Sequence, residues 1–215
     1  MKIFLDTGDI ESIRKANATG LISGVTTNPT HLRNTGRGFR ETAKEICDEI
    51  SGTVSVEAVG ERADDLIRHA QEIAKIAPNI VVKIPMTVEG LKAVPVLSKE
   101  LNIKTNVTMI FSSTQVFLAM KAGATYASIV LSRLDAVANE SSTLIYDAVT
   151  IKKNYGFGSE VLAASLKTQN HVLDVLRAGI DIASLPVSLF FQMYQHPLTD
   201  AGLAQFAKDW QEVPK

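Results

Sequence analysis

Lys83 is the residue whose surroundings in the sequence most suggest chemistry. It lies in the middle of the apolar run 81–85. Lysine is almost never fully buried without a partner, and burial disfavours the charged ammonium form. A neutral amine attacks carbonyl carbon, so we interpret Lys83 as a candidate for Schiff-base formation. The alternative is a structural lysine at the end of a strand, paired with Glu57 or Asp6.

Asp6 and Glu57 are candidates for general acid and base catalysis. Schiff-base chemistry requires proton transfers, because the carbinolamine loses water and a substrate hydroxyl loses its proton. Two carboxylates near one lysine can divide this work, one acting directly and one through a water molecule. The alternative roles are structural, with Asp6 as the N-cap of a helix and Glu57 as the charge partner of Lys83.

Several other apolar runs also carry polar side chains. These side chains lie inside a run, at its end or just after it, and could bind a substrate. Amides and hydroxyls that could hold a polar ligand are Thr27, Asn28, Asn106, Thr108 and Ser128. Arg133, Ser165 and Lys167 suggest an anion site, since arginine offers a planar fork for phosphate and lysine a point charge. Solvated surface positions are the alternative for these three residues.

The four histidines show no metal-ligand spacing, so we do not expect a metal-dependent aldolase. His69 and His171 fall within helical patterns and are interpreted as surface or packing residues. His196 precedes a proline in a turn. His31 follows Asn28 closely enough to face a site, but we interpret it as a residue of a surface loop.

Eight short apolar runs recur along the chain at regular intervals. They are rich in Val, Ile and Thr and several are continuously apolar, as is typical of parallel strands buried on both faces. The runs are 2–7, 24–29, 53–59, 80–86, 103–109, 125–132, 160–165 and 181–187, and helical patterns lie at 40–50, 63–76, 114–121 and 170–178.

Alternating strands and helices predict an α/β fold, a (β/α)8 TIM barrel formed by one domain over residues 1–215. An open doubly wound sheet is the second choice. That fold usually has a glycine-rich turn after its first strand, and residues 6–9 contain none. In a barrel the active site lies at the C-terminal ends of the strands, where most of the candidate residues fall.

Glycines follow several of the helical patterns and are expected to end helices, namely Gly20, Gly52, Gly123 and Gly179. A last amphipathic segment, 199–210, predicts an extra C-terminal helix, and we assign 199–215 to a helical arm. Such a helix could cover the barrel or dock on a neighbouring subunit.

Composition limits the classes of partner. The chain has 215 residues, of which 46% are hydrophobic and 21% charged, and a net charge of −1. This balance gives no overall basic field for nucleic acid or an anionic membrane. A single cysteine, Cys47, excludes an internal disulfide. We see no signal-peptide pattern and no run of about 18 apolar residues, and therefore expect a cytoplasmic protein without a membrane span.

Three short motifs, 25–29 (VTTNP), 82–87 (VKIPMT) and 104–108 (KTNVT), together resemble the transaldolase family. The resemblance is to its small bacterial branch, which includes fructose-6-phosphate aldolase, and it runs from residues 4–7 to 196–200. It implies a (β/α)8 barrel, class I chemistry without metal or cofactor, and sugar phosphates as substrates. It also implies a homo-oligomer of pentamers paired into decamers, with the C-terminal helix crossing to a neighbour.

The resemblance also implies roles for the candidate residues. Lys83 would be the Schiff-base lysine and Asp6 the acid/base group. Glu57 with Thr108 would position the catalytic water. Asn28 and Asn106 would hold substrate hydroxyls, and the residues around the sugar phosphate would be Ser128, Arg133, Ser165 and Lys167.

Four positions bear on the activity within this branch. Relatives similar to fructose-6-phosphate aldolase tend to have glutamine at position 57, so Glu57 favours a transaldolase. Val130 replaces an aromatic residue of either type, while Ile129 and Ser132 replace a usual proline and glycine. Loss of the aromatic ring is expected to enlarge or dry the pocket near the lysine. The anionic group of the substrate is then a phosphate or a sulfonate.

The sequence therefore predicts a transaldolase that moves a dihydroxyacetone unit from a ketose phosphate, such as fructose 6-phosphate, to an aldose acceptor. One alternative is an aldolase that releases free dihydroxyacetone, and another is a transaldolase for a related anionic sugar such as a sulfosugar. A third is a barrel that binds sugar phosphate without catalysis, which would form no covalent adduct.

Overall fold

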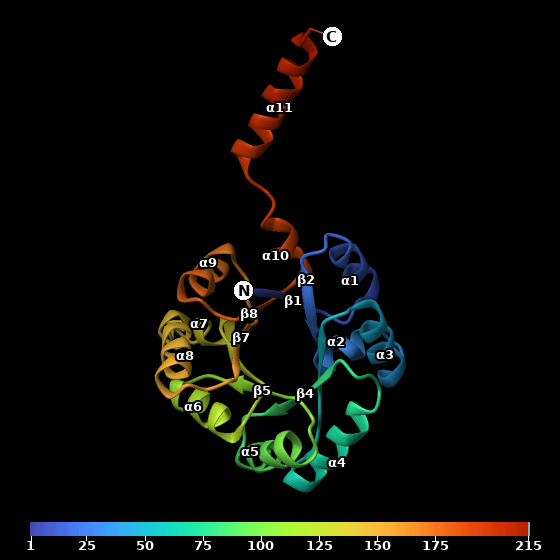
Figure 1. Ribbon diagram of the computed structural model, residues 1–215, viewed down its shortest axis with the longest axis vertical. Helices are drawn as coiled ribbons and strands as arrows, with labels where there is room; N and C mark the ends of the chain where they lie inside the picture. The colour runs from blue at the N-terminus through green and yellow to red at the C-terminus, as the bar shows by residue number, and fades with distance from the viewer. Residues whose placement is uncertain (215) are drawn as a thin grey trace.

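Eight short segments pair side by side as parallel strands and close into a barrel in sequence order (Figure 1). The computed structural model describes residues 1–214. The strands are β1 Lys2–Asp6, β2 Ile22–Thr26, β3 Thr53–Glu57, β4 Ile80–Pro85, β5 Thr105–Ile110, β6 Tyr126–Val130, β7 Glu160–Ala164 and β8 Ile182–Leu185. The predicted barrel is confirmed, and the open doubly wound sheet is excluded because β1 also pairs with β8.

Helices surround the barrel and connect its strands (Figure 1). They are α1 Ile10–Asn17, α2 Pro29–Asn34, α3 Phe39–Glu49, α4 Ala63–Ala74, α5 Val88–Pro95 followed by the π-helical turn η1 Val96–Glu100, α6 Ser113–Ala122, α7 Ser132–Asp135, α8 Ser141–Tyr155, α9 Gln169–Ala178, α10 Val187–Gln192 and α11 Pro197–Glu212. Within residues 1–214, no helix combines the length and apolar character needed to cross a membrane.

Side chains along each strand point alternately into the barrel and toward the helices, and this divides the core into an inner and an outer part. Side chains that point into the barrel form a small inner cluster of Phe4, Val81, Tyr126, Leu162 and Ile182. Their neighbours along the strands belong to a larger cluster shared with the helices. Because successive side chains of a strand point to opposite faces, residues two positions after the inner cluster again face the interior. These positions carry the polar residues of the site.

The second strand ends earlier than the sequence suggests. The predicted run was 24–29, whereas β2 ends at Thr26 and Pro29 begins α2. Proline fits the first position of a helix, where its missing N–H leaves no bond unmade. Asn28 caps this helix, since its side-chain oxygen accepts a hydrogen bond from the backbone of His31 at 2.9 Å. The run 125–132 is shortened similarly, because α7 begins at Ser132.

Two of the four glycines expected to end helices are helix C-caps. Gly123 and Gly179 have φ of 96° and 76°, a left-handed conformation that suits glycine. Gly20 is also left-handed, with φ of 74°, but it lies two residues beyond Ala18, the C-cap of α1. The expectation for Gly52 is wrong, because α3 ends at Glu49 and continues into extended backbone. Gly52 instead allows the backbone of Ser23 to lie close to it, since a Cβ atom at Gly52 would overlap the carbonyl oxygen of Ser23.

Helix α8 has no counterpart among the predicted helices. Its buried residues are Ser141, Leu144, Ile145 and Ala148. They are followed by the β-branched stretch 149–151, which in isolation favours a strand. Packing against α6 and α9 supplies the stability that the local pattern lacks.

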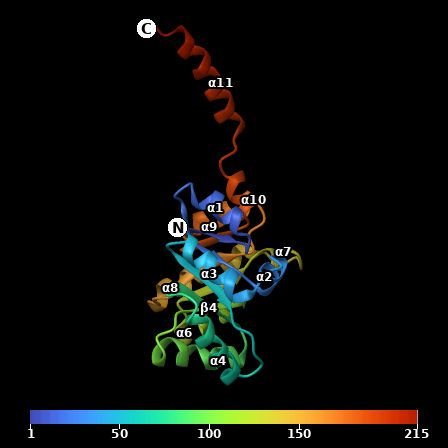
Figure 2. The same cartoon turned by 90° about the vertical axis from the view of Figure 1, so that its right-hand side faces the viewer.

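The predicted arm is a helix that leaves the barrel. Helix α11 begins at Pro197, projects away from the other helices (Figures 1 and 2), and buries none of its side chains. It therefore does not cover the barrel. Leu203, Phe206 and Trp210 are 62%, 70% and 76% exposed, and their spacing places them on one face of the helix.

Candidate active site

Strand register brings three polar residues together inside the barrel. Glu57 on β3 is level with Lys83 on β4, and Lys83 is level with Asn106 on β5. Lys83 faces the interior because it lies two residues after the inner-core residue Val81. The three side chains therefore extend into one space inside the barrel.

Lys83 is buried and held by two acceptors. The residue is only 9% exposed. Its Nζ donates to the carbonyl oxygen of Thr27 at 2.9 Å and lies 3.3 Å from Oε2 of Glu57. These acceptors offset the cost of burying a cation. The Glu57 carboxylate is also near enough to take a proton from the amine, which must be neutral to act as a nucleophile.

Asp6 is held by hydroxyl groups from two neighbouring strands. Thr26 Oγ1 donates to Oδ1 of Asp6 at 3.0 Å, and Thr26 lies 2.7 Å from the hydroxyl of Ser184 on β8. A threonine hydroxyl has one hydrogen, so Ser184 donates to Thr26. Within residues 1–214, Oδ2 of Asp6 has no hydrogen-bond partner, which leaves this oxygen available to a substrate.

A buried hydrogen-bond chain fixes the amide of Asn106. Ser128 Oγ donates to its Oδ1 at 2.6 Å, and its Nδ2 donates to Ser55 Oγ at 3.1 Å. Asn106 and Ser128 are at most 1% exposed. The amide orientation is thus set by neighbouring strands before any ligand binds, and the second hydrogen of Nδ2 remains for a substrate hydroxyl.

Arg133 and Ser165 form the opposite side of the site. The Arg133 guanidinium approaches the Met109 sulfur at 3.7 Å, and in the described part of the chain it has no carboxylate partner. Ser165 Oγ lies 2.6 Å from Ser132 Oγ. Met109 and Ser165 adopt positive φ of 64° and 59°, conformations that non-glycine residues adopt at a cost and that occur often at functional sites. An unpaired cation beside two hydroxyls can bind an anion.

These residues surround a cavity of about 350 Å³. It is lined by Asp6, Thr26, Asn28, Pro29, Thr30, Glu57, Lys83, Asn106, Thr108, Met109, Ser128, Val130, Arg133, Leu162, Ala164 and Ser165. Nine of the eleven predicted site residues are among them. Asp6, Glu57 and Lys83 come from β1, β3 and β4, whereas Arg133 follows β6, so the cavity suits a polar ligand with one anionic end.

Two predicted site residues are placed differently. The side chain of Thr27 is turned away from the cavity and donates to the carbonyl oxygen of Ser55 at 2.9 Å, so Thr27 reaches the site only through its own carbonyl. Lys167 is exposed and lies outside the cavity lining, and its backbone N–H donates to Nδ1 of His171.

Alternation also explains the unusual sixth strand. Val130 faces the cavity, whereas Ile129 packs outward in the larger core cluster. Ser132 belongs to α7, and its hydroxyl contacts Ser165. Only Val130 and Ser132 of these three departures therefore act at the site.

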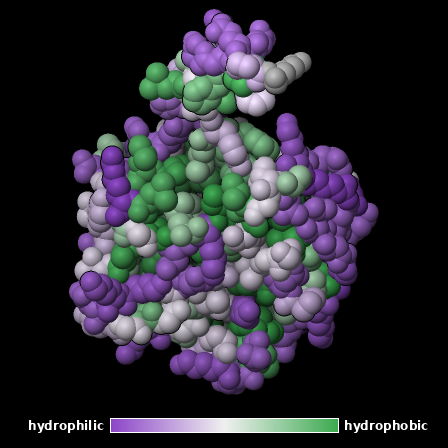
Figure 3. All heavy atoms as spheres, turned by 45° about the horizontal axis from the view of Figure 1, so that its top comes forward, coloured by the Kyte–Doolittle hydropathy of each residue, from purple (hydrophilic) through white to green (hydrophobic). Residues whose placement is uncertain are grey.

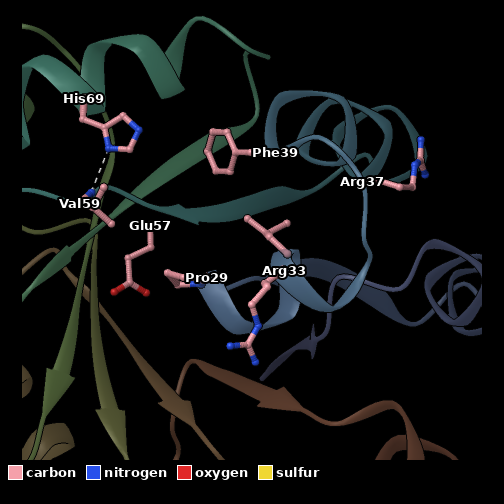
Figure 4. Close-up of a pocket in the computed structure, with 8 residues that line it drawn as sticks. Pro29, Arg33, Arg37, Phe39, Glu57, Val59 and His69 are labelled. Carbon is pink, nitrogen blue, oxygen red and sulfur yellow. Dashed lines mark hydrogen bonds between the residues drawn. The ribbon is translucent and has the colours of Figure 1, made fainter.

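A second cavity of about 290 Å³ adjoins the first and shares Glu57 and Pro29 with it. In Figure 4 the rings of Phe39 and His69 face the same gap, and their centroids are 6.3 Å apart. His69 is fixed there, since its Nδ1 accepts a hydrogen bond from the backbone of Val59 at 3.0 Å. This confirms a packing role for His69.

His31 lies beside the site, and its interpretation as a surface-loop residue is wrong. It belongs to α2, its side chain is 26% exposed, and its Nδ1 lies 3.6 Å from Oδ1 of Asp6. Thr26, Thr30 and Met109 are further site residues that sequence reasoning missed. The period-two pattern of β2 could have indicated Thr26, but His31 depends on a helix that no local pattern predicted. Within residues 1–214, no group of three or more His, Cys, Asp or Glu side chains is arranged to hold a metal ion.

Known proteins resemble this chain over its whole length. The model of the Transaldolase/Fructose-6-phosphate aldolase family matches residues 3–215. A "Probable transaldolase" of Thermoanaerobacter sp. (strain X514) is 50% identical over 213 residues, which cover 99% of this chain and 98% of the relative. Another "Probable transaldolase", from Dictyoglomus turgidum (strain DSM 6724 / Z-1310), is 45% identical over 215 residues. The aligned residues cover 100% of both chains.

The fold also occurs in more distant proteins. A crystal structure from Burkholderia cenocepacia J2315, described as that of "a putative phosphonomutase", matches with a TM-score of 0.62 and 12% identity, covering 95% of this chain and 92% of the other. At that identity the likeness shows a shared fold alone. The family match and the full-length relatives say more: this enzyme belongs to the Transaldolase/Fructose-6-phosphate aldolase family.

Proposed function

We propose that the protein is a class I transaldolase in which Lys83 forms a Schiff base with the C2 carbonyl of a ketose phosphate such as fructose 6-phosphate. The observation that carries this proposal is the buried amine with a carboxylate 3.3 Å from its Nζ. Glu57 accepts the ammonium proton, and Lys83 Nζ then attacks C2. Loss of water from the carbinolamine gives the iminium ion, an electron sink for the next step.

Asp6 is the base for cleavage. Its Oδ2 takes the proton of the C4 hydroxyl, the O–H electron pair forms the C4 carbonyl, and the C3–C4 bond breaks. The electrons of that bond form the C2=C3 double bond, and the π electrons of the iminium bond move to nitrogen, leaving a three-carbon enamine on Lys83. The amides of Asn28 and Asn106 hold the hydroxyls of this fragment. Addition of the enamine to an aldose phosphate reverses the same steps.

Glu57 and Thr108 position the water that forms and breaks the Schiff base. Both line the cavity, and Thr108 is 5% exposed. A carboxylate and a hydroxyl are suited to orient one water molecule beside C2. Glu57 also favours transfer over release of free dihydroxyacetone, because relatives similar to fructose-6-phosphate aldolase tend to have glutamine there.

Arg133 and Ser165 bind the anionic end of the sugar. The guanidinium group is free of carboxylate partners among residues 1–214, and Ser165 is oriented by Ser132. A phosphate and a sulfonate both offer tetrahedral oxygens to these donors. The small side chain of Val130 leaves extra space between this end and the lysine.

Self-association through α11 is part of the same proposal. The helix exposes Leu203, Phe206 and Trp210 on one face, and an apolar face of this size on an isolated helix is costly in water. Figure 3 shows apolar side chains gathered on the body of the molecule beneath the arm. Helix α9, near that end, exposes Leu173 and Leu176. A second copy of the chain offers the matching apolar surface.

Borohydride trapping tests the covalent step. The protein is incubated with fructose 6-phosphate, reduced with borohydride and mapped by mass spectrometry. We expect a reduced three-carbon adduct on Lys83. Lys83→Met removes the adduct and turnover, while the matched control Lys92→Met, which changes an exposed lysine, retains both. Normal turnover in Lys83→Met would contradict the mechanism, and wild-type protein without any adduct would favour a non-catalytic binding barrel.

A second assay separates the two activities of the family. Ketose phosphate is supplied with and without an aldose phosphate acceptor. A transaldolase turns over many times only when the acceptor is present. Sustained release of dihydroxyacetone without the acceptor would assign the alternative, an aldolase.

A further inference from the structure

A partly buried histidine that the mechanism does not use, His31, lies beside Asp6. Nδ1 of His31 is inaccessible to solvent and has no hydrogen-bond partner in the described part of the chain. Its nearest anionic neighbour is Oδ1 of Asp6, at 3.6 Å. Buried polar atoms without a partner are rare in proteins because each costs free energy. This atom therefore points to a contact that forms when the site is in use.

The cap of α2 determines which nitrogen of His31 carries the proton. Oδ1 of Asn28 accepts the backbone N–H of His31 at 2.9 Å, which turns Nδ2 of Asn28 toward Nε2 of His31 at 3.5 Å. An amide nitrogen only donates, so Nε2 is the acceptor of this pair. A neutral imidazole has one N–H, and these partners assign it to Nδ1, the atom that faces Asp6.

The two donors near Asp6, Thr26 and His31, lie next to the same carboxylate oxygen, Oδ1. Thr26 Oγ1 already donates to Oδ1 at 3.0 Å. A second bond from His31 to Oδ1 would fix the plane of the carboxylate and leave Oδ2 directed at the substrate. The orientation of a catalytic base is commonly set by such a supporting donor.

The surroundings of His31 are not fully packed, so its side chain can adjust its position. The histidine lines a cavity of about 320 Å³ together with Gly8, Asp9 and Arg37. A shift of about 0.7 Å brings 3.6 Å to an ordinary N–H···O distance. At Gly8 a Cβ atom would lie 3.1 Å from the carbonyl oxygen of His31, so the absence of a side chain there lets α2 approach β1.

We propose that His31 is a positioning residue for the proton transfer, donating from Nδ1 to Oδ1 of Asp6 so that Oδ2 receives the proton of the C4 hydroxyl. This inference rests on the proposed function. His31 gains and loses no proton in the step: the hydroxyl proton goes to Oδ2 of Asp6, and the electrons move to the enamine as before. His31 does not line the catalytic cavity and acts through Asp6 alone.

Two substitutions at one position test the donor. His31→Leu removes it, whereas His31→Asn places an amide nitrogen near the position of Nδ1. We expect His31→Leu to lower kcat at least tenfold, the effect of losing one hydrogen bond to a charged group, with KM for the ketose phosphate unchanged. We expect His31→Asn to retain kcat within about threefold. Both variants still form a borohydride-reduced Schiff base on Lys83, with the intact ketose phosphate or with its three-carbon fragment, since Schiff-base formation precedes the step that Asp6 catalyses.

A measurement without turnover separates this inference from the function on which it rests. The imidazole ¹⁵N spectrum of the four histidines is recorded for the wild type and for Asp6→Asn, with His31 assigned by its loss in His31→Leu. We expect an Nδ1–H tautomer whose signal shifts in Asp6→Asn. An Nε2–H tautomer, or equal kcat in wild type and His31→Leu, overturns the role of His31. The expected spectrum in a wild-type protein without adduct or turnover would instead overturn the proposed function.

Discussion

The ion pair of Lys83 and Glu57 affects both the stability of the protein and its proposed chemistry. Their ion pair lies inside the barrel, and each side chain is at least three-quarters buried. Removing one member of such a pair leaves the other as an uncompensated charge, which costs about 3–5 kcal/mol when the pair is fully buried. The partial exposure of Glu57 lowers that cost, so variants at Lys83 should remain folded. Loss of activity in these variants would then result from loss of the catalytic amine and not from unfolding.

The anion end of the site gives a prediction for single residues. Arg133→Leu should raise KM for a ketose phosphate about tenfold or more, because a charge-assisted hydrogen bond to the phosphate is lost. Steady-state kinetics measure this, with dihydroxyacetone, which has no phosphate, as the control donor whose KM should not change. Lys167→Leu is the matched variant and should have a smaller effect, since Lys167 lies outside the cavity lining. Equal effects of the two substitutions would contradict this assignment.

Cys47 gives a second prediction at the residue scale. Burial raises the pKa of its thiol from 9.0 to about 11, and the side chain lies within the core. Only the thiolate is reactive, so alkylation by iodoacetamide at pH 8 should be slow in the native protein and rapid in denaturant. The native state holds the thiol proton more tightly than the unfolded chain does. The contribution of this group to stability is therefore complete below pH 9 and lost as the pH rises toward 11.

Mass spectrometry of the alkylated protein measures the labelling, and Cys47→Ala, which has no other cysteine to react, is the control. Fast labelling of native protein at pH 8 would mean that the α3 region opens readily. The stability effect is measured as the difference between wild type and Cys47→Ala in denaturant titrations at pH 8 and pH 10.5.

At the scale of elements, the polar network depends on how closely neighbouring strands approach. Gly24 on β2 leaves space for the ring of Phe4, because a Cβ atom there would lie 2.7 Å from it. Gly52, just before β3, allows the backbone to meet Ser23. These contacts set the position of β2, which carries Thr26 toward Asp6, and of β3, which carries Glu57 toward Lys83.

Replacing Gly52 tests this dependence. Gly52→Ala should lower the free energy of unfolding by roughly 2 kcal/mol, because the added methyl group overlaps the backbone of Ser23 and the strands must separate. Thermal unfolding followed by circular dichroism measures the change. Gly158→Ala is the matched control, since a Cβ atom there meets nothing within 4 Å. A Gly52→Ala protein as stable as this control would show that the close approach is not needed.

At the scale of the whole molecule, the barrel and the arm differ in how they are stabilised. The barrel buries its own apolar residues in two clusters, whereas α11 has no buried residue. A helix of 16 residues is marginally stable alone in water. The arm therefore requires an apolar partner surface to remain helical, and a second copy of the chain is our proposal.

Light scattering after size exclusion tests this proposal. The wild type should have a mass of at least two chains of 23.3 kDa each. Combined changes of Leu203, Phe206 and Trp210 to Glu should yield a monomer, because they place charges on the apolar face. The control changes Gln205 and Lys208 to Glu on the opposite face and should keep the wild-type mass. A monomeric wild type would contradict the proposal.

Much of the fold, and most of the residues that line the candidate site, could be predicted from the sequence, because both depend on local patterns. Continuous apolar runs separated by amphipathic windows predict strands and helices in alternation, and eight such units predict a barrel. A lysine inside one of these runs is unusual wherever the run lies in space. The same argument selects Asp6 and Glu57, carboxylates at the ends of the first and third strands.

Contacts between distant residues were decided only by the tertiary structure. Register between strands placed Glu57 and Asn106 level with Lys83, whereas alternation within one strand shows only which face a side chain takes. The short helix α2 brought His31 to Asp6, and the turn after β7 left Lys167 outside the cavity. A sequence pattern tells which face of an element is apolar. The positions of polar side chains relative to one another follow from the packing of whole elements, which depends on the entire chain.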